Sequence, residues 1–289
     1  PPRMRPAALP PVAAAAGVST AEAAADGEDC PALVGNVWRR AQQAAGCREV
    51  QNALEDAEGD WEREALVAEL RGHAAEAARC PHANHVLQKA VECLPPRAVQ
   101  FVVDELRRAS IVQMAKHKYG CRVVQRLIEH CYEEQVEPML DELLKDIGAL
   151  SRHPYGNYVV QVVLQHGGEA HRRKIARSLR KELRVLGAEP TGCAVIAAAL
   201  QYADADDQLQ LTQALVKEPG LVVFMASVRH GDIAVTRLLS MLSGAELDTA
   251  TSRLAGDLPS LRATKYGRQV ASFLEGAGVV DKSATVAGA

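Results

Sequence analysis

The fold of this 289-residue chain is decided by one stretch, Tyr155-Gly156-Asn157-Tyr158-Val159-Val160-Gln161-Val162-Val163-Leu164. Its apolar residues recur at the spacing of one face of an α-helix, namely Val159, Val160, Val163 and Leu164. Asn157 and Gln161 lie four residues apart on the opposite face, one helical turn from each other. Gly167 and Gly168 then end the helix. The stretch therefore predicts an amphipathic helix with a packing face and a polar, solvent-facing side.

The same pattern recurs along the chain at a nearly constant interval. The residue that follows its Gly, or once an Ala, falls at positions 47, 84, 121, 157, 193, 232 and 268. The successive differences are 37, 37, 36, 36, 39 and 36 residues, an interval typical of helical repeats. Such units cannot bury their apolar faces alone, so they stack on one another. The sequence therefore predicts an all-α fold, an α-solenoid (a curved superhelix) of about seven repeats.

Each unit is expected to hold a second helix, and some a short third one. The second helix after Gly168 has an apolar face of Ile175, Leu179 and Leu183 and an outer face of Arg172, Arg173, Lys174 and Arg177. In the preceding unit we expect the second helix from Glu137 to Ile147, with Leu140, Leu143, Leu144 and Ile147 turned inward. Short segments such as Ala149 to Arg152 are expected to form a brief additional helix.

Four of the seven units share a second pattern on the polar face. Each carries Asn or Cys, then a flat side chain, then Gln four residues after the first: Cys47/Arg48/Gln51, Asn84/His85/Gln88, Cys121/Arg122/Gln125 and Asn157/Tyr158/Gln161. The last three units keep the apolar face but carry Cys193/Ala194/Ala197, Asp232/Ile233/Thr236 and Arg268/Gln269/Ser272. Because core packing does not require Asn, Tyr and Gln on a solvent face, the pattern indicates a function beyond packing.

These residue types fit the recognition of nucleic-acid bases. Gln presents a donor and an acceptor side by side, which match a base edge. A planar residue one step along the helix is rotated by about 100° and fits between neighbouring bases. We interpret eight residues as base-reading, namely Cys47, Gln51, Asn84, Gln88, Cys121, Gln125, Asn157 and Gln161. Four are interpreted as base-stacking, namely Arg48, His85, Arg122 and Tyr158. The alternative is an ordinary solvated polar face, but the recurrence of the same pattern in phase in four units argues against it.

The repeats resemble those of the Pumilio family, in which each helical repeat recognises one RNA base. The resemblance is close from Cys80 to Leu183 and looser over residues 31–280. It is carried by Asn84-His85-Val86-Leu87-Gln88-Lys89, by Tyr119-Gly120-Cys121-Arg122-Val123-Val124-Gln125-Arg126-Leu127-Ile128-Glu129-His130-Cys131, and by Tyr155-Gly156-Asn157-Tyr158-Val159-Val160-Gln161. It implies a curved array with single-stranded RNA on its concave face, and N-terminal repeats toward the RNA 3′ end.

The resemblance also implies a base sequence. In the family, Asn with Gln selects uracil and Cys with Gln selects adenine. From 5′ to 3′ the pairs Asn157/Gln161, Cys121/Gln125, Asn84/Gln88 and Cys47/Gln51 would therefore read U-A-U-A. The family further implies binding to mRNA 3′ untranslated regions and post-transcriptional regulation through effector proteins. We expect such effectors on the convex or C-terminal surface of a monomer in the cytoplasm.

The C-terminal units depart from the family pattern. The family usually has eight repeats, and seven are found here. The unit after Asn157 should carry Ser, Asn and Glu for guanine, but it has Cys193, Ala194 and Ala197. The next should read uracil, but it places Asp232 toward the RNA phosphates. We therefore expect these units to act mainly as a scaffold.

The distribution of charge supports a central interface. The net charge is −3, yet residues 79–184 hold 18 Lys and Arg against 12 Asp and Glu, a balance of +6. The flanking parts hold the remaining 15 basic and 24 acidic residues. If RNA binds, the middle of the chain should supply most of the attraction to phosphate.

The other side chains that could take part in catalysis or metal binding do not form a catalytic pattern. Seven Cys, with no Cys-x-x-Cys pair, indicate neither disulfides nor a zinc site, and no cofactor is expected. His117 and His153 share one repeat position and His130 and His166 another, which favours helix-end or solvated histidines over a metal or acid–base site. No apolar run is long enough to predict a transmembrane helix. The chain is expected not to be an enzyme.

Three parts of the chain are expected: a disordered Ala/Pro-rich tail at 1–30, the repeat domain at 31–280 and a disordered tail at 281–289. Part of a targeting peptide is the alternative for the first tail. Two other functions remain open. One is a divergent relative, nucleolar in location, that binds structured or pre-ribosomal RNA with little sequence choice. The other is a protein-binding solenoid of the HEAT or armadillo type.

Overall fold

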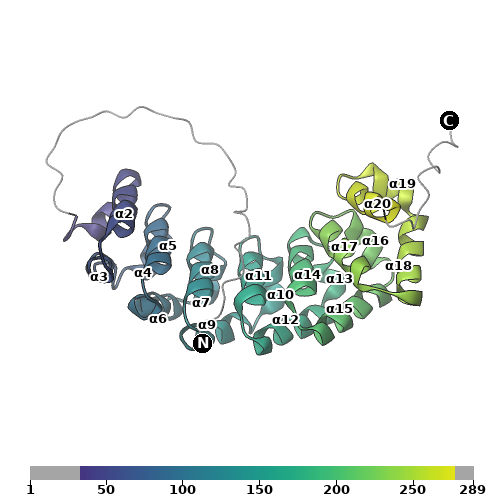
Figure 1. Ribbon diagram of the computed structural model, residues 1–289, viewed down its shortest axis with the longest axis horizontal. Coiled ribbons are helices and arrows are strands. Elements are labelled where there is room, and N and C mark those ends of the chain that lie inside the picture. Colours follow the sequence, from purple (N-terminus) through teal and green to yellow (C-terminus); the bar gives the residue numbers. More distant parts are fainter. Residues whose placement is uncertain (1–32, 277–289) are drawn as a thin grey trace. The chain divides into compact units, whose positions relative to one another are not determined.

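The computed structural model describes residues 33–276, and every regular element in this range is a helix (Figure 1). The helices follow one another as triplets of a short helix, a helix of what we call the inner row, and a helix of the outer row. Six triplets and the first two helices of a seventh lie within the described range. The prediction of an all-α solenoid with about seven repeats is confirmed.

The inner row contains the helices that the repeated motif predicted. Its members are α2 (Ala44–Asp56), α5 (Ala83–Cys93), α8 (Gly120–His130), α11 (Gly156–His166), α14 (Pro190–Tyr202), α17 (Gly231–Met241) and α20 (Gly267–Gly276). Each packs against the next member of the row. Within residues 33–276 the stack bends toward this row, which therefore lines its concave side (Figure 1).

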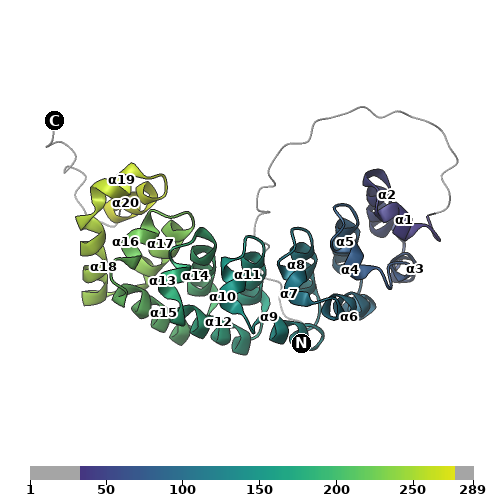
Figure 2. The same ribbon diagram turned by 180° about the vertical axis from the view of Figure 1, so that it is seen from behind.

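The outer and short helices complete each triplet. The outer row contains α3 (Asp60–Ala68), α6 (Gln100–Arg108, preceded by the 3₁₀ turn η1, Pro96–Val99), α9 (Glu133–Leu143), α12 (Glu169–Lys181), α15 (Ala205–Lys217) and α18 (Gly244–Gly256). The short helices are α1 (Val37–Ala41), α4 (Ala74–Ala77), α7 (Ile111–Ala115), α10 (Ile147–Arg152), α13 (Leu183–Leu186), α16 (Leu221–Ala226) and α19 (Leu258–Ala263). Seen from behind, the short helices lie beside the inner row and the outer helices along the opposite edge (Figure 2).

One continuous apolar core runs through the triplets. The apolar faces identified from the sequence are buried, including the weak units, where Ile196, Leu238 and Leu274 are almost fully enclosed. The repeats therefore remain one stack even where the polar pattern is lost, because the buried apolar area that drives stacking is unchanged.

Glycine at the start of an inner helix allows the short helix before it to approach closely. A Cβ atom on Gly192 would lie 2.1 Å from the carbonyl oxygen of Leu186, and one on Gly231 would lie 2.1 Å from that of Met225. A side chain at either position would therefore push the two helices apart. This contact explains why the repeated motif begins with Gly in six units.

Carboxylates on the outer helices tie neighbouring triplets together. The Oε1 and Oε2 atoms of Glu105 accept hydrogen bonds from the backbone N–H groups of Gly72, at 2.7 Å, and Ala74, at 2.9 Å. Glu69 makes the same two bonds to the N–H groups of Gly35 and Val37. Because these N–H groups begin α4 and α1, the carboxylates satisfy donors that the short helices cannot satisfy internally.

One predicted boundary was wrong. The sequence predicted a single helix from Glu137 to Ile147, but α9 ends at Leu143 and Ile147 begins α10. Asp146 precedes α10 and its side chain accepts a hydrogen bond from the N–H of Ala149, which starts a new helix in the middle of the predicted one. The brief helix predicted at Ala149 to Arg152 is confirmed as part of α10.

Residues 1–32 and 277–289 lie outside the described range, so the two predicted tails and the outer limits of the predicted repeat domain remain predictions. Among the helices of residues 33–276, none combines the length and the apolar character that a bilayer crossing demands.

Candidate nucleic-acid interface

The inner row brings all twelve predicted base-reading and base-stacking residues onto α2, α5, α8 and α11, near the N-terminal end of each helix. The first residue of each triad is less open than the sequence predicted. Asn84 and Cys121 are each 1% exposed, Asn157 is 2% exposed and Cys47 is 3% exposed. Their expected position on a solvent-facing side was wrong, because the loop ahead of the helix engages Asn84, Cys121 and Asn157, and the next triplet engages Cys47. The Sγ atom of Cys47, for example, lies 3.1 Å from the carbonyl oxygen of His82.

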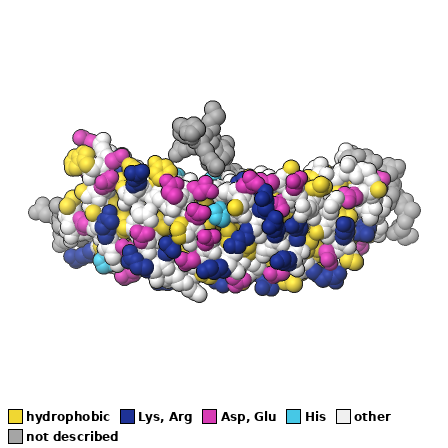
Figure 3. All heavy atoms as spheres, turned by 90° about the horizontal axis from the view of Figure 1, so that it is seen from below, with side chains coloured by type: hydrophobic (Ala, Val, Ile, Leu, Met, Phe, Trp, Pro, Cys, Tyr) yellow, Lys and Arg dark blue, Asp and Glu magenta, His cyan; other side chains and the backbone are white. Residues whose placement is uncertain are grey.

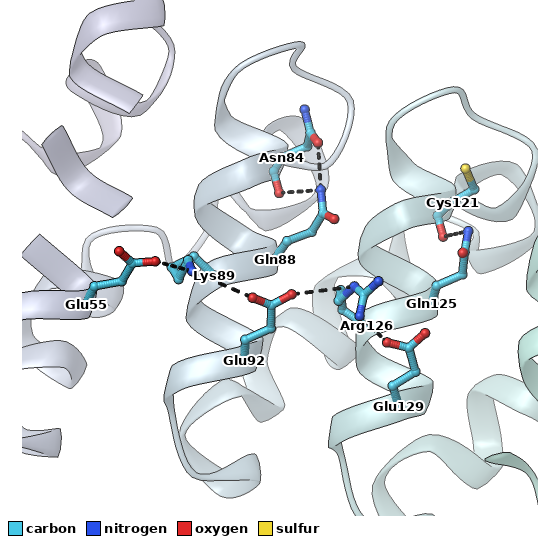
Figure 4. A network of polar contacts seen from close by, with 9 residues as sticks. All are labelled: Glu55, Asn84, Gln88, Lys89, Glu92, Cys121, Gln125, Arg126 and Glu129. Carbon is cyan, nitrogen blue, oxygen red and sulfur yellow. Dashed lines mark hydrogen bonds and ion pairs between the residues drawn. The ribbon is translucent and has the colours of Figure 1, made fainter. Parts of the chain in front are cut away.

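The Gln residues lie at the surface end of the same pairs, and each is held by its partner one turn earlier. The Nε2 atoms of Gln88 and Gln161 donate to Oδ1 of Asn84 and Asn157, both at 2.9 Å. Gln125 donates at 2.9 Å to the carbonyl oxygen of Cys121 (Figure 4). These six residues therefore form three preoriented pairs of two kinds, which fix the amide planes before any ligand binds.

The first repeat has the same geometry in a more open setting. Gln51 donates from Nε2 to Sγ of Cys47 at 3.1 Å and to its carbonyl oxygen at 3.2 Å. Burial is the main reason that the pKa of the Cys47 thiol is raised. The thiol therefore stays protonated at neutral pH, as a neutral hydrogen-bonding group must.

The predicted stacking residues are the more exposed members of the triads. Arg48, His85 and Arg122 are exposed, whereas Tyr158 is half-buried. The guanidinium carbon of Arg122 lies 5.6 Å from the centre of the Tyr158 ring, so the flat groups of two adjacent repeats already meet. Burial, followed by the charge of His82, lowers the pKa of His85. At neutral pH His85 is therefore an uncharged ring suited to stacking.

A ladder of ion pairs, which the sequence analysis missed, runs along the inner row next to the Gln residues (Figure 4). Lys89 contacts Glu55 of the preceding repeat and lies 3.9 Å from Glu92. Glu92 in turn lies 3.6 Å from Arg126, which also contacts Glu129. The signal in the sequence was a basic residue five positions, and Glu eight positions, after the first triad residue. These side chains are partly exposed, so each pair contributes little stability and serves mainly to orient the helices.

Histidines ahead of two inner helices act as helix caps. Nδ1 of His117 accepts hydrogen bonds from the N–H groups of Tyr119 and Gly120, each at 3.2 Å. His153 does the same for Tyr155 and Gly156. The helix-end interpretation of these histidines is confirmed, and within residues 33–276 no His, Cys, Asp and Glu side chains cluster as metal ligands would.

The inner helices α14, α17 and α20 lack the paired polar groups. Ala197 is 5% exposed, and its carbonyl oxygen accepts from Nη1 of Arg237 at 2.6 Å. Burial, followed by the charge of Asp232, raises the pKa of Cys193 to about 12. Asp232 is itself 4% exposed, and its Oδ1 has no hydrogen-bond partner among the described residues. These repeats keep the scaffold without the reading groups, as the sequence indicated.

The fold and the site together define the class of the protein: an α-solenoid whose inner row presents four in-phase polar triads. A family model described as the Pumilio-family RNA binding repeat matches residues 73–107, 110–144 and 146–179. These segments correspond to the triplets α4–α6, α7–α9 and α10–α12. They cover the region where the sequence motif is most complete.

Curated proteins and solved structures agree with this match. Pumilio homology domain family member 4 of Saccharomyces cerevisiae is 33% identical over 92 residues, which are 32% of this chain and 10% of that protein. Fem-3 mRNA-binding factor 2 of Caenorhabditis elegans is 37% identical over 86 residues, which are 29% of this chain and 13% of that protein. The matches thus span only about a tenth of the length of these relatives.

The solved structures extend the likeness over most of the chain. PUF-8 in complex with PBE-RNA has a TM-score of 0.75 at 27% identity, over 84% of this chain and 72% of that one. The Puf3 RNA binding domain bound to a Cox17 RNA 3′ UTR recognition sequence has a TM-score of 0.73 at 23% identity, over 84% of this chain and 74% of that one. At that lower identity the likeness concerns the fold alone. Residues 73–179 thus match the Pumilio-family repeat, and the fold of most of the chain resembles that of the RNA-bound PUF-8 structure.

Proposed function

We propose that the inner row binds single-stranded RNA, one base per repeat, with a U-A-U-A core. The observation that carries this proposal is the set of four pairs on α2, α5, α8 and α11. In each pair a Gln is hydrogen-bonded to a Cys or Asn one turn away, beside a flat side chain. Four pairs of similar geometry at a nearly constant spacing suit a polymer of regularly spaced bases better than they suit a single protein surface.

Burial of the first triad residues sets how the bases would be read. Gln51, Gln88 and Gln161 are half-buried and Gln125 is 6% exposed, whereas Asn84, Cys121 and Asn157 are more completely enclosed. We infer that the Gln makes the main hydrogen bond to the base edge, and that the Asn or Cys fixes the Gln rotamer and the space available. Uracil, which has a carbonyl acceptor, would suit the Asn repeats. Adenine, which presents a smaller polar edge for the protein to hydrogen-bond, would suit the Cys repeats.

Binding to RNA would also require the stacking groups of adjacent repeats to separate. Arg122 lies against the Tyr158 ring in the free protein. A base that enters between them would exchange one cation–π contact for two stacking contacts, a change favoured by about 1–3 kcal/mol per stacked base. The basic balance of residues 79–184 would add attraction to phosphate without adding base preference.

The biological setting follows from the family. We propose that the RNA is the 3′ untranslated region of mRNA, and that binding regulates expression after transcription in the cytoplasm. Two observations support this: the solved neighbour Puf3 is bound to a 3′ UTR recognition sequence, and the curated relative of Caenorhabditis elegans is named an mRNA-binding factor. The protein is proposed to act as a monomer without catalysis.

Selection from a random RNA pool tests the proposal. The purified protein is mixed with the pool, and the bound RNAs are amplified and sequenced over several rounds. Enrichment of single-stranded U-A-U-A supports the four-repeat assignment. Recovery of structured RNAs without a shared sequence would favour the divergent, low-selectivity alternative, and no enrichment would contradict RNA binding by the inner row.

A further inference from the structure

The outer face carries a groove between α10 and α12 that the proposed RNA interface does not use. Its volume is about 470 Å³, and α12 of the outer row supplies most of its lining, whereas the proposed base-reading residues lie on the inner row. Its apolar floor is formed by Leu144 and Ile147. Its α12 side carries four basic residues, namely Arg173, Lys174, Arg177 and Lys181. It exists because α12 packs more against α10 than against α9, the preceding helix of the outer row. We call it the α12 groove.

Three of the four basic residues of the α12 groove are not neutralised within the part of the chain that the structure describes. In residues 33–276, no ion pair or hydrogen bond engages the side chains of Lys174, Arg177 or Lys181. By contrast, Arg172 is 3.8 Å from Asp204, and Arg173 contacts Glu169 on its own helix. The three unpaired cations are therefore available to an external anion.

The spacing of these three cations along α12 makes them repel one another when no ligand is bound. Lys174, Arg177 and Lys181 follow one another at intervals of three and four residues, so they share one face of α12. Like charges at these intervals destabilise a helix, and Arg173 adds a fourth charge four residues before Arg177. An anionic ligand in the groove would relieve this repulsion.

The surroundings favour a short ligand that lies along α12 over a long one that crosses the outer row. The neighbouring helix α9 carries Glu133, Glu134, Glu137, Asp141 and Glu142 and no basic residue. On the other side, α15 begins with Asp206 and Asp207. Lys and Arg side chains gather near the middle of this face with Asp and Glu side chains around them (Figure 3). An RNA strand that ran across the outer row would meet repulsion on both sides.

The floor of the groove favours a peptide over a nucleic acid as its ligand. Leu144 is 2% exposed and Ile147 is 4% exposed, so the groove ends on the apolar core. Its lining includes no aromatic side chain on which a base could stack. Ala170 is the exposed apolar residue of the lining, so an aliphatic side chain would rest on Ala170 above these two residues, and carboxylates on either side of it would reach the cations.

From these observations we propose that the α12 groove binds an acidic peptide segment of a partner protein, with its aliphatic side chains on Ala170, above Leu144 and Ile147. Its carboxylates pair with Lys174, Arg177 and Lys181. The partner thereby docks on the outer face and leaves the inner row free. This inference does not depend on RNA binding by the inner row, although the two together would let one chain hold an RNA and a protein at once.

The test uses the full chain and a dye-labelled peptide of sequence Glu-Asp-Leu-Glu-Glu-Leu-Asp-Glu, followed by fluorescence anisotropy at fixed salt. The groove variant is K174A/R177A/K181A. The matched control, R97A/R108A/K217A, removes the same charge from exposed positions outside the groove. We expect the groove variant to lose about tenfold or more in affinity and the control to change less than about threefold, because only paired charges contribute strongly.

A second variant separates the apolar contact from the charges. A170W places a large ring in the groove, which Ala170 lines, and leaves the cations in place. It should weaken the leucine-containing peptide more than a matched peptide with Gly in place of Leu. Equal binding of the labelled peptide by wild type and groove variant, or no binding by wild type, would overturn the proposal. Displacement of the peptide by an RNA without U-A-U-A would overturn it in favour of a nucleic-acid site.

Discussion

At the scale of single residues, each proposed base assignment depends on two side chains of one inner helix, of which the second is less enclosed than the first. In α8 these are Cys121, 1% exposed, and Gln125, 6% exposed. The first residue positions the amide of the second through a bond within the helix, so a change at either position alters the same recognition group. Recognition by a pair of this kind makes the base preference of one repeat open to redesign without a change in the fold.

The double substitution C121S/Q125E should move the preference of that repeat from adenine to guanine. A carboxylate accepts hydrogen bonds from guanine N1–H and N2–H but repels the adenine N1 lone pair. The selected RNA should change from U-A-U-A to U-G-U-A, with a shift of about 1–3 kcal/mol at that base. Because Gln125 is buried, thermal unfolding should be measured beside RNA binding, to show that the new carboxylate has not unfolded the repeat.

A matched pair of substitutions in the first repeat controls for position. C47S/Q51E makes the same change on α2 and should alter the last base, to give U-A-U-G. If either double variant still selected U-A-U-A while remaining folded, the assignment of repeats to bases would be wrong.

The flat residue of α11 provides a second prediction at this scale. Replacing Tyr158 by Ala should weaken RNA binding by about 1–3 kcal/mol, the typical contribution of one stacked base. The free energy of unfolding should fall by less than about 1 kcal/mol, because the ring is half-buried and its main polar contact is with Arg122. Titrations at constant salt give the first quantity and chemical denaturation the second. An unchanged dissociation constant would count against stacking on the inner row.

Residue identity and spacing correctly placed the twelve proposed site residues on one row of helices, but did not predict their exposure. The amphipathic pattern placed Asn84 and Asn157 opposite the core, where an isolated helix would expose them. In the folded protein the loop ahead of each inner helix engages them: Nδ2 of Asn84 donates to the carbonyl oxygen of Cys80, and Nδ2 of Asn157 to those of His153 and Pro154. Their enclosure depends on the path of this loop, which helical periodicity does not predict.

At the scale of elements, the short and inner helices depend on side chains that satisfy their first N–H groups. His117 and His153 do this for α8 and α11 through Nδ1, which requires a neutral ring. Burial is the main cause that lowers the pKa of both rings, and the charges of Arg79 and Lys116, respectively, lower it further. The folded protein therefore favours the neutral form more than the unfolded chain does.

This difference predicts a loss of stability in mild acid. As pH falls below the ordinary His value of about 6.5, the unfolded chain takes up these protons first. The stabilisation is complete above that pH and is lost as the pH approaches the lower pKa of the folded state. The melting temperature of the wild type should therefore drop between about pH 7.5 and pH 5.5.

The variant H117N/H153N isolates the effect, because Asn also caps helices but does not titrate in this range. Its melting temperature should depend less on pH than that of the wild type, since the other histidines are unchanged in both proteins. An identical pH dependence in the two proteins would mean that the caps do not couple folding to protonation.

Helix existence was predictable from the sequence, whereas one helix end was not. The apolar residues Leu140, Leu143, Leu144 and Ile147 continue at helical spacing through the true end of α9, so periodicity alone predicted one helix. The break is made by Asp146, whose side chain bonds to the N–H of Ala149. The apolar pattern favours one continuous helix, whereas the capping residue favours a new helix start. The packing of α10 against α11 and α12 favours the new start.

At the scale of the whole described range, charge and polar pairs are distributed unequally. The inner helices α2, α5, α8 and α11 carry the proposed reading groups, and the first three also carry the ion-pair ladder, whereas α14, α17 and α20 carry neither. The sequence predicted this division, because the apolar face persists where the triads are lost. It did not predict the α12 groove, which depends on how the outer helices pack against one another. The C-terminal repeats are accordingly expected to close the hydrophobic stack without selecting bases.

Titration with single-base variants of one RNA, U-G-U-A-U-A, at constant ionic strength tests directly whether the four triads alone select the sequence. A change at any base of the U-A-U-A part should weaken binding by about 1–3 kcal/mol, because it leaves a hydrogen-bonding group unpaired. Replacing the preceding G by any other base should cost less than about 0.5 kcal/mol, since Ala194 and Ala197 offer it no polar group. A strong demand for that G, or equal tolerance at every position, would contradict recognition by the four triads.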